Sequence, residues 1–228
     1  MNRASETERN CVSELGFALV SDIVSADEVR RLRSELGPAT SAGRRGLLAI
    51  DGLAAFSQSM ALLRLIRPHL PREPRCVRAL YFDKSPQMNW SVPWRQDLTL
   101  ALRRQVDAPG FGPWSCKDGI PHVQPPIRLL EEMLTLRIHL DDAEGCNRAL
   151  RVLPGSHRFG RLSAEKIREL RREGKEVLCR ARAGDVLLMR PLLLHTSGKT
   201  TTGGQRRVIH LEYAGFELPS GLEWSQEG

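Results

Sequence analysis

The sequence has no long apolar run. Its apolar stretches, such as Val186–Met189 and Leu192–Leu194, are far shorter than a segment that crosses a lipid bilayer. The N-terminal stretch Met1–Cys11 is polar and charged, which is not typical of a secretory signal peptide. We therefore expect a cytoplasmic protein that does not contact a membrane.

Paired cysteines and repeated segments are also absent. The cysteines are odd in number, scattered and without any CxxC pair: Cys11, Cys76, Cys116, Cys146 and Cys179. This pattern favours reduced, mostly buried thiols over a catalytic or zinc-binding role. The sequence contains no internal repeat, low-complexity stretch or long linker, so residues 1–228 are expected to form a single domain.

The composition is that of a globular and basic protein. Hydrophobic residues make up 41% and charged residues 27%, values that exclude a disordered chain. The formal net charge of +7 raises the hypothesis of nucleic-acid binding. However, the basic residues are spread along the chain, and Arg168, Arg171 and Arg172 interleave with acidic residues. The sequence favours an anionic small-molecule substrate over nucleic acid and leaves the oligomeric state open.

Helices are predicted mainly near the N-terminus. Ser25–Glu28 is a capping box followed by Val29, Leu32 and Leu36 at helical spacing, which predicts a helix that ends at Gly37. Further segments are predicted as a short strand at Gly16–Val20, a helix at Ser57–Ile66 and a surface helix at Ala164–Arg172.

From Cys76 onward, short apolar segments alternate with Pro and Gly, a pattern typical of strands. Strands are predicted at Cys76–Phe82, Leu134–Leu140, Ala149–Leu153, Glu176–Arg180, Val186–Met189 and Arg207–Tyr213. Many short strands after a helical N-terminal region predict a mainly β fold, a sandwich or barrel with helices on its outside.

Three segments contain the residues that indicate chemistry. They are Asn89–Asp97, Arg182–His195 and Gln205–Tyr213, and Leu140–Asp142 and Leu153–His157 lie between the first two in a fixed order. This ordered set resembles the phytanoyl-CoA dioxygenase family of iron(II)/2-oxoglutarate-dependent oxygenases, from about Gly16 to Tyr213. The resemblance implies a double-stranded β-helix (jelly roll) with flanking α-helices, iron(II) and 2-oxoglutarate as cofactors, and hydroxylation of a small molecule.

The resemblance also identifies the positions of the metal ligands. Members of this superfamily hold iron with two histidines and one carboxylate, of which His-x-Asp lies on one strand and the second histidine on another. The matching positions here are Arg95, Asp97 and His195. Asp97 and His195 match the catalytic metal ligands, whereas an arginine has no lone pair to give a metal at neutral pH. We expect Arg95 to pair with the Asp97 carboxylate instead.

Three interpretations of this substitution follow. Asp97 and His195 hold a metal with additional water, another histidine replaces the missing ligand, or the chain has lost iron chemistry and keeps the pocket as a metal-free binding site. The first candidate for a replacement ligand is His139, on the predicted strand Leu134–Leu140. The remaining histidines are interpreted as a residue of a loop near the pocket (His122), a cap of a turn (His157) and a core residue (His210).

The binding site for 2-oxoglutarate is implied by a second group of residues. Arg206 stands eleven residues after His195, the spacing of the family, and is predicted to bind the far carboxylate of the cosubstrate. Arg207 takes this role if the register differs by one residue. Lys84 and Arg137 are further candidates for cofactor binding, with Thr135 a weaker one, and at least one of Trp90 and Trp94 is expected in the core. Arg148 is a second departure, because the family has glycine there.

Overall fold

Two antiparallel sheets face each other in the computed structural model of the protein, which describes residues 6–39, 43–85, 89–143, 149–199, 205–219 and 221–226. The larger sheet has the order β1-β10-β7-β12-β2, with β1 Phe17–Val20, β10 Val186–Met189, β7 Met133–His139, β12 Arg206–Ala214 and β2 Arg75–Lys84. The smaller has the order β3-β11-β8-β9, with β3 Val92–Arg95, β11 His195–Ser197, β8 Leu150–Val152 and β9 Val177–Cys179. This is the jelly-roll architecture that the motifs implied.

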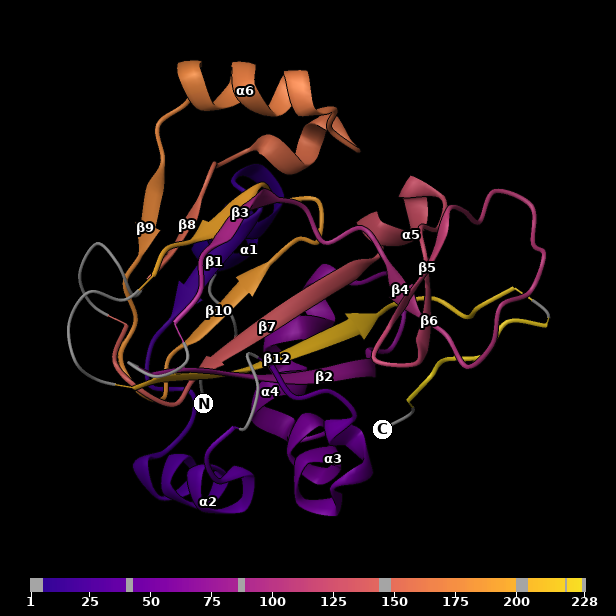
Figure 1. The fold of residues 1–228 in the computed structure, drawn as a ribbon. Coiled ribbons are helices and arrows are strands. Elements are labelled where there is room, and N and C mark those ends of the chain that lie inside the picture. Colours follow the sequence, from indigo (N-terminus) through magenta and orange to yellow (C-terminus); the bar gives the residue numbers. More distant parts are fainter. Residues whose placement is uncertain are drawn as a thin grey trace.

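Helices cover the outer face of the larger sheet. They are α1 Glu6–Glu14, α2 Ala26–Leu36, α3 Asp51–Ser57 and α4 Met60–Ile66. Figure 1 shows α2, α3 and α4 below the sheet. Alternate apolar residues of the strands, such as Leu136, Leu188 and Leu211, pack with the helices in one core. Because successive side chains of a strand point to opposite faces, the intervening residues face the smaller sheet.

A third small sheet closes one end of the space between the two large ones (Figure 1). Its strands are β4 Leu100–Ala101, β6 Ile120–Val123 and β5 Trp114–Lys117, in the order β4-β6-β5. These strands pack with α5, Ile127–Glu131, in a separate apolar cluster that includes Leu130 and Trp224. The remaining helix, α6 Ala164–Glu173, lies over the outer side of the smaller sheet (Figure 1).

Most predicted elements are confirmed, with one helix assigned wrongly. The side chain of Ser25 caps α2 by accepting a hydrogen bond of 3.2 Å from the backbone N–H of Glu28. The segment Ser57–Ile66 is not one helix, because Ser57 ends α3 and Ser59, in an extended conformation, precedes α4. Among the described α-helices and strands, α1, β4, β5, β6 and α5 were not predicted, whereas β3 and β11 are the strands that the resemblance implied for the metal ligands.

The cysteines only partly follow the expectation. Cys76 and Cys179 are buried, Cys11 is half-buried and Cys116 is exposed, and these four thiols are free. Cys146 and the departure at Arg148 lie outside the described residues. No helix in the described part of the chain is long and apolar enough to cross a membrane.

The turn that leads into β10 requires a glycine. Gly184 has a φ of +95°, and a Cβ atom there would lie 2.5 Å from the carbonyl oxygen of Val24. Next to it, Asp185 accepts hydrogen bonds from the backbone N–H groups of Asp22 (3.0 Å) and Arg182 (2.7 Å). The Gly-Asp motif is therefore a structural turn that joins β10 to the segment after β1.

We expect Gly184→Ala to destabilise the fold more than an alanine substitution at a glycine that has a positive φ but no close neighbour. Gly119 is the matched control, because its φ is +77° and a Cβ atom there would meet nothing within 4 Å. Gly119→Ala should lower the free energy of unfolding by about 1 kcal/mol, and Gly184→Ala by roughly twice that or more. Urea unfolding of the three proteins measures both effects, and equal losses would contradict the proposed close contact.

Candidate active site

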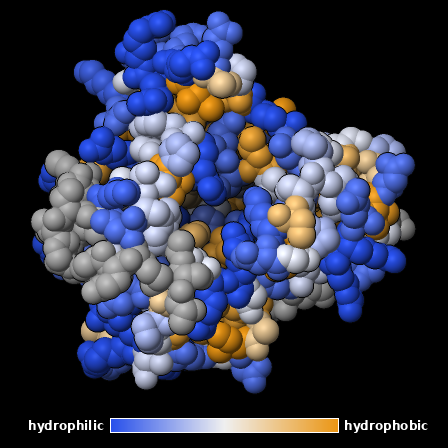
Figure 2. Space-filling view, viewed as in Figure 1, coloured by the Kyte–Doolittle hydropathy of each residue, from blue (hydrophilic) through white to orange (hydrophobic). Residues whose placement is uncertain are grey.

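A cavity of about 630 Å³ lies between the two large sheets. It is lined by β2, β12 and β7 of the larger sheet, by β3 and β11 of the smaller one, and by Lys117 of β5. Its opening is the hollow at the centre of Figure 2, with hydrophilic residues around much of it. Of the residues that the sequence analysis assigned to metal and cosubstrate, six line this cavity: Lys84, Arg95, Asp97, Arg137, His195 and Arg206. His139, Thr135 and Arg207 do not.

The floor of the cavity is set by the pairing of β12 with its two neighbours. Every second side chain of β12 points toward the cavity. The residues opposite it on β2 and β7 point the same way. Along the strand, the cross-strand rows are Arg206 with Lys84, Val208 with Phe82 and His139, His210 with Leu80 and Arg137, and Glu212 with Arg78 and Thr135. The first row of the floor therefore contains two cations, Arg206 and Lys84. The third row contains Arg137 beside a histidine and a leucine, and the fourth contains the ion pair of Glu212 with Arg78.

Asp97 and His195 lie together on the opposite wall. The Asp97 Oδ2 atom is 3.6 Å from His195 Nε2. The other ring nitrogen of His195 donates a hydrogen bond of 2.9 Å to the carbonyl oxygen of Leu193, so the Nε2 lone pair faces the carboxylate. The position of the ring is set by the Pro-Gly-Ser-His motif, because Ser156 Oγ accepts a 2.8 Å hydrogen bond from the backbone N–H of Leu194.

The protonation states of Asp97 and His195 give this pair donor atoms that could hold a cation. Burial lowers the pKa of His195, and the opposing charge of Asp97 does not restore it, so the ring is neutral at neutral pH. Burial alone would raise the pKa of Asp97, but the neighbouring His195 and the Arg95 guanidinium hold it well below its ordinary value. A carboxylate oxygen and an imidazole lone pair that face each other repel unless a cation lies between them.

Arg95 supplies a positive charge to this carboxylate. Its Nη2 atom donates a hydrogen bond of 2.8 Å to Asp97 Oδ1, as the sequence analysis expected. Asp97 itself lies beyond the end of β3, where its backbone N–H donates to the carbonyl of Pro191 at 2.9 Å. The intervening Gln96 is buried, and its amide group donates to the carbonyl of Leu192 at 2.6 Å. This anchor, which the sequence analysis missed, turns both neighbouring side chains toward the cavity mouth.

Within the described part of the chain, no further ligand joins Asp97 and His195. Among the described residues, no three His, Cys, Asp or Glu side chains form a group that could hold a metal ion. His139 is buried on β7 outside the cavity lining, so the structure does not bring it together with the pair. His122 lies on β6 and not in a loop, with its Nδ1 2.8 Å from the carbonyl of Ile120. His157 contacts the carbonyl of Ser13 at 3.1 Å, which agrees with its interpretation as a cap.

The first row of the floor, at one end of the cavity, consists of the buried cations Lys84 and Arg206. We call it the cationic end. Lys84 Nζ donates hydrogen bonds of 2.9 Å to Ser197 Oγ and to the carbonyl of Gly198, and Arg206 Nη1 donates to Ser197 Oγ at 3.3 Å. Burial, together with the charges of Arg206 and Arg137, lowers the pKa of Lys84 to about 7. Arg207 points to the other face of the sheet, where it pairs with Asp141 at 2.8 Å.

A hydrogen-bonded chain crosses the third and fourth rows. Arg137 Nη1 donates to His210 Nδ1 at 3.0 Å, His210 Nε2 lies 3.3 Å from Glu212 Oε1, and Arg78 Nη1 donates to the same carboxylate at 3.1 Å. His210, which the sequence analysis interpreted as a core residue, is buried, and its side chain lines the cavity. Burial lowers the pKa of Arg137 to about 10, and this side chain makes no ion pair within the described residues.

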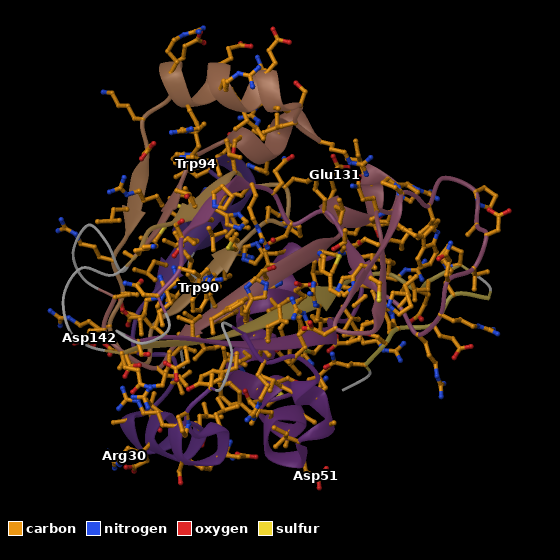
Figure 3. The ribbon with its side chains drawn as sticks, viewed as in Figure 1. Arg30, Asp51, Trp90, Trp94, Glu131 and Asp142 are labelled. Atoms are coloured by element: carbon orange, nitrogen blue, oxygen red, sulfur yellow. The ribbon has the colours of Figure 1, made fainter. Side chains whose placement is uncertain are left out.

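The two tryptophans, Trp90 just before β3 and Trp94 on it, lie apart, as Figure 3 shows. Trp90 lines the cavity, with its ring 4.9 Å from Lys84 Nζ. The Trp94 ring lies 5.5 Å from the guanidinium carbon of Arg171, on α6. Neither is fully buried, so the expectation that one belongs to the core is wrong.

Comparison with known sequences assigns the chain to a family. Residues 12–208 match the family of phytanoyl-CoA dioxygenase (PhyH). The chain belongs to the phytanoyl-CoA dioxygenase family. No curated protein sequence matches it. Within this family assignment, Asp97, His195 and Arg206 stand at the positions that the motifs implied, and all three line one cavity.

Solved structures share the fold at low sequence identity. AviO1 from Streptomyces viridochromogenes is 20% identical with a TM-score of 0.69, and the match covers 96% of this chain and 98% of AviO1. HygX from Streptomyces hygroscopicus, with nickel and 2-oxoglutarate bound, is 19% identical with a TM-score of 0.65 and coverages of 92% and 87%. EctD from S. alaskensis, with bound Fe, is 20% identical with a TM-score of 0.70 and coverages of 93% and 77%.

The buried lysine predicts a pH dependence of stability. The pKa of Lys84 is about 7 in the folded protein, whereas an unfolded lysine has a pKa of about 10.4. Between these pH values the unfolded chain holds a proton that the folded chain has released, so stability rises with pH. We expect the difference in unfolding free energy between the native protein and Lys84→Met to increase from pH 7 to 9, by at most about 1.4 kcal/mol per pH unit.

Urea unfolding at a series of pH values checks this expectation. Lys175→Met is the control, because Lys175 is exposed and lies outside the cavity. Its stability should follow that of the native protein at every pH. A Lys84→Met curve that also runs parallel to the native one would show that Lys84 stays protonated throughout.

Proposed function

We propose that this chain is an iron(II)/2-oxoglutarate-dependent oxygenase that oxidises a small molecule. The observation that carries the proposal is the Asp97–His195 pair, with 3.6 Å between Oδ2 and Nε2, on the wall of the cavity whose floor holds buried Lys84 and Arg206. A metal-binding pair and an anion-binding end in one cavity suit a metal and a dicarboxylate that bind together. The presence of metal and 2-oxoglutarate in HygX, and of Fe in EctD, supports the same cofactors for this member of the family.

Two of the three residues at the ligand positions fit iron. The carboxylate of Asp97 and the neutral Nε2 atom of His195 are donor types that iron(II) accepts, and their lone pairs face each other. Arg95 does not fit, because its guanidinium is a cation without a lone pair. We assign Asp97 and His195 as the residues that would hold the metal. Bound iron would supply the activation of dioxygen, coupled to the oxidative decarboxylation of 2-oxoglutarate.

The cationic end would hold the far carboxylate of 2-oxoglutarate. Arg206 and Lys84 are 3% and 2% exposed, so an anion that binds between them is withdrawn from water and strongly attracted. Both side chains already donate to Ser197 Oγ, which keeps their donors directed at one point. Arg137 lies two rows further along the floor and adds positive charge toward the 2-oxo acid end of the cosubstrate.

A specific contact favours a second candidate, a metal-free member of the family that keeps the cavity for binding. Arg95 Nη2 lies 2.8 Å from Asp97 Oδ1 and provides the positive charge that the carboxylate needs without a metal. In that case Lys84, Arg137 and Arg206 still form an anion site. The two candidates differ in iron binding and not in the binding of 2-oxoglutarate.

Replacing Arg206 tests the site for the cosubstrate. We expect Arg206→Ala to weaken 2-oxoglutarate binding by about 2 kcal/mol or more, roughly thirtyfold in Kd, because a buried charge-assisted pair is lost. Arg206→Lys, which keeps the charge but not the planar pair of donors, should show an intermediate loss. Isothermal titration calorimetry with 2-oxoglutarate measures all three affinities.

The neighbouring arginine provides the matched control. Arg207→Gln removes an equal charge one residue away but on the opposite face, where Arg207 contacts Asp141. It should lower the stability of the fold and leave the affinity for 2-oxoglutarate within about twofold of the native value, since no contact with the cavity is lost. If Arg207→Gln weakens binding as much as Arg206→Ala, the assignment of Arg206 is wrong.

Replacing Arg95 by histidine tests the two candidates against each other. Arg95→His adds a ligand and removes a positive charge, so iron(II) affinity should rise by at least about tenfold. The uncoupled conversion of 2-oxoglutarate to succinate should rise with it. An anaerobic iron(II) titration and a succinate assay measure these two quantities.

The control for this substitution is Arg103→His, which places a new histidine on an exposed side chain outside the cavity. It should bind iron(II) as the native protein does. Weak but measurable iron binding and slow turnover by the native protein support the oxygenase. Iron binding that appears only in Arg95→His supports the metal-free alternative.

A further inference from the structure

The cavity extends well past the space that 2-oxoglutarate would occupy. From Arg206 to Glu212 the floor runs six residues along β12, about 20 Å at the rise of a β-strand. A five-carbon dicarboxylate spans only about 6–7 Å. The Asp97–His195 pair lies on the opposite wall of the same cavity. The fourth row and the adjoining wall are left for the primary substrate.

Three cations gather at this far end of the cavity. They come from different elements: Arg45 from the segment before α3, Arg78 from β2 and Lys117 from β5. Arg45 pairs with Asp118, and Arg78 pairs with Glu212. Lys117 reaches only the hydroxyl of Thr99, 3.4 Å from its Nζ atom, and makes no ion pair with a described residue.

Positively charged side chains also outnumber negatively charged ones in the described lining of the cavity as a whole. Within the described lining, seven side chains are Lys or Arg and three are Asp or Glu, a difference of four positive charges. The cations are Arg45, Arg78, Lys84, Arg95, Lys117, Arg137 and Arg206, and the carboxylates are Asp97, Asp118 and Glu212. Iron(II) adds two positive charges and 2-oxoglutarate two negative ones, so the binding of both cofactors leaves the imbalance unchanged.

We propose that the primary substrate is a small organic anion whose carboxylate or phosphate group binds at the far end, to Lys117 beside Arg78. This inference rests on the proposed function, which assigns the opposite end to 2-oxoglutarate. Glu212 and Arg206 are six residues apart on β12, so the anionic group lies about 20 Å along the floor from the end assigned to 2-oxoglutarate.

Two further observations support an anion at this position. Lys117 is an exposed residue, and partial burial of its side chain and the repulsion of Arg78, Arg95 and Arg45 lower its pKa, an effect that a bound anion would relieve. The Arg95 side chain is 55% exposed at the same mouth and adds a further positive charge there. Arg95, which stands where the family has a histidine ligand, thus places a positive charge near the anionic group of the proposed substrate.

The test separates the two ends of the cavity. N-oxalylglycine at saturating concentration fills the 2-oxoglutarate end, and inorganic phosphate or succinate is then titrated while binding is followed by calorimetry. Two variants are compared with the native protein: Lys117→Gln, at the far end, and Lys175→Gln, at an exposed position outside the cavity.

We expect phosphate or succinate to bind in the presence of N-oxalylglycine. Binding of succinate indicates a carboxylate subsite, and binding of phosphate indicates a phosphate subsite. Lys117→Gln should weaken that binding at least fivefold, and Lys175→Gln should leave it unchanged. The proposal is overturned if neither anion binds the native protein, or if Lys117→Gln binds both as tightly as the native protein does.

A failure of the proposed function gives a different result. If N-oxalylglycine itself does not bind, the cosubstrate assignment is wrong, and the far end is then tested alone in Arg206→Ala without N-oxalylglycine. Anion binding in that protein that is lost in the double variant with Lys117→Gln supports the far subsite. Anion binding that does not depend on Lys117 contradicts it.

Discussion

The pairing of β12 with β2 on one side and β7 on the other determines where every charge of the cavity floor lies. A strand presents alternate residues to opposite faces, so Ile209, Leu211 and Tyr213 enter the helix-covered core while Arg206, His210 and Glu212 face the cavity. A slip of one residue would exchange these two sets. It would put Arg207 in the cavity and bury His210 and the charged Glu212 among leucines. The apolar core under the sheet therefore holds the site in register.

This arrangement places charged groups where they weaken the fold. Lys84, Arg137 and Arg206 are each less than 9% exposed, and their pKa values fall to about 7, 10 and 9 because of burial and mutual repulsion. Burying several cations close together is unfavourable, and for Lys84 and Arg137 the hydrogen bonds and ring contacts within the described residues offset part of it. A binding site for an anion explains why such a cluster is present, because the ligand brings negative charge to it.

The sequence predicts those features that depend on local patterns or on several motifs in order. The capping box of α2 specifies that helix by itself, and the set of motifs implied both the jelly roll and the meeting of Asp97 with His195. The contact between Arg95 and Asp97 was also predictable, since side chains two positions apart lie on one side of an extended segment. The choice between Arg206 and Arg207 was open, because β12 is buried on both faces and its alternation carries little information.

Contacts between residues far apart in the chain could not be predicted, because no local sequence pattern indicates them. Lys84 and Ser197 meet although 113 residues separate them, and nothing near either residue indicates the contact. His210 was assigned to the core because apolar residues surround it in the sequence, yet Arg137 and Glu212 hold it in the cavity. The break between α3 and α4 was missed because the apolar spacing continues across it and only the extended backbone of Ser59 interrupts the helix.

The exposure of Arg95 decides how strongly it opposes a metal. The Arg95 side chain is 55% exposed and Asp97 only 16%, so the guanidinium is largely hydrated while the carboxylate is not. An ion pair with one exposed partner contributes about 1 kcal/mol or less, because the exposed charge regains water when the pair breaks. A dication between Asp97 and His195 interacts with both lone pairs at once and in a less hydrated place. Arg95 is therefore a weak competitor for Asp97, and its main effect on iron is the ligand that it does not provide.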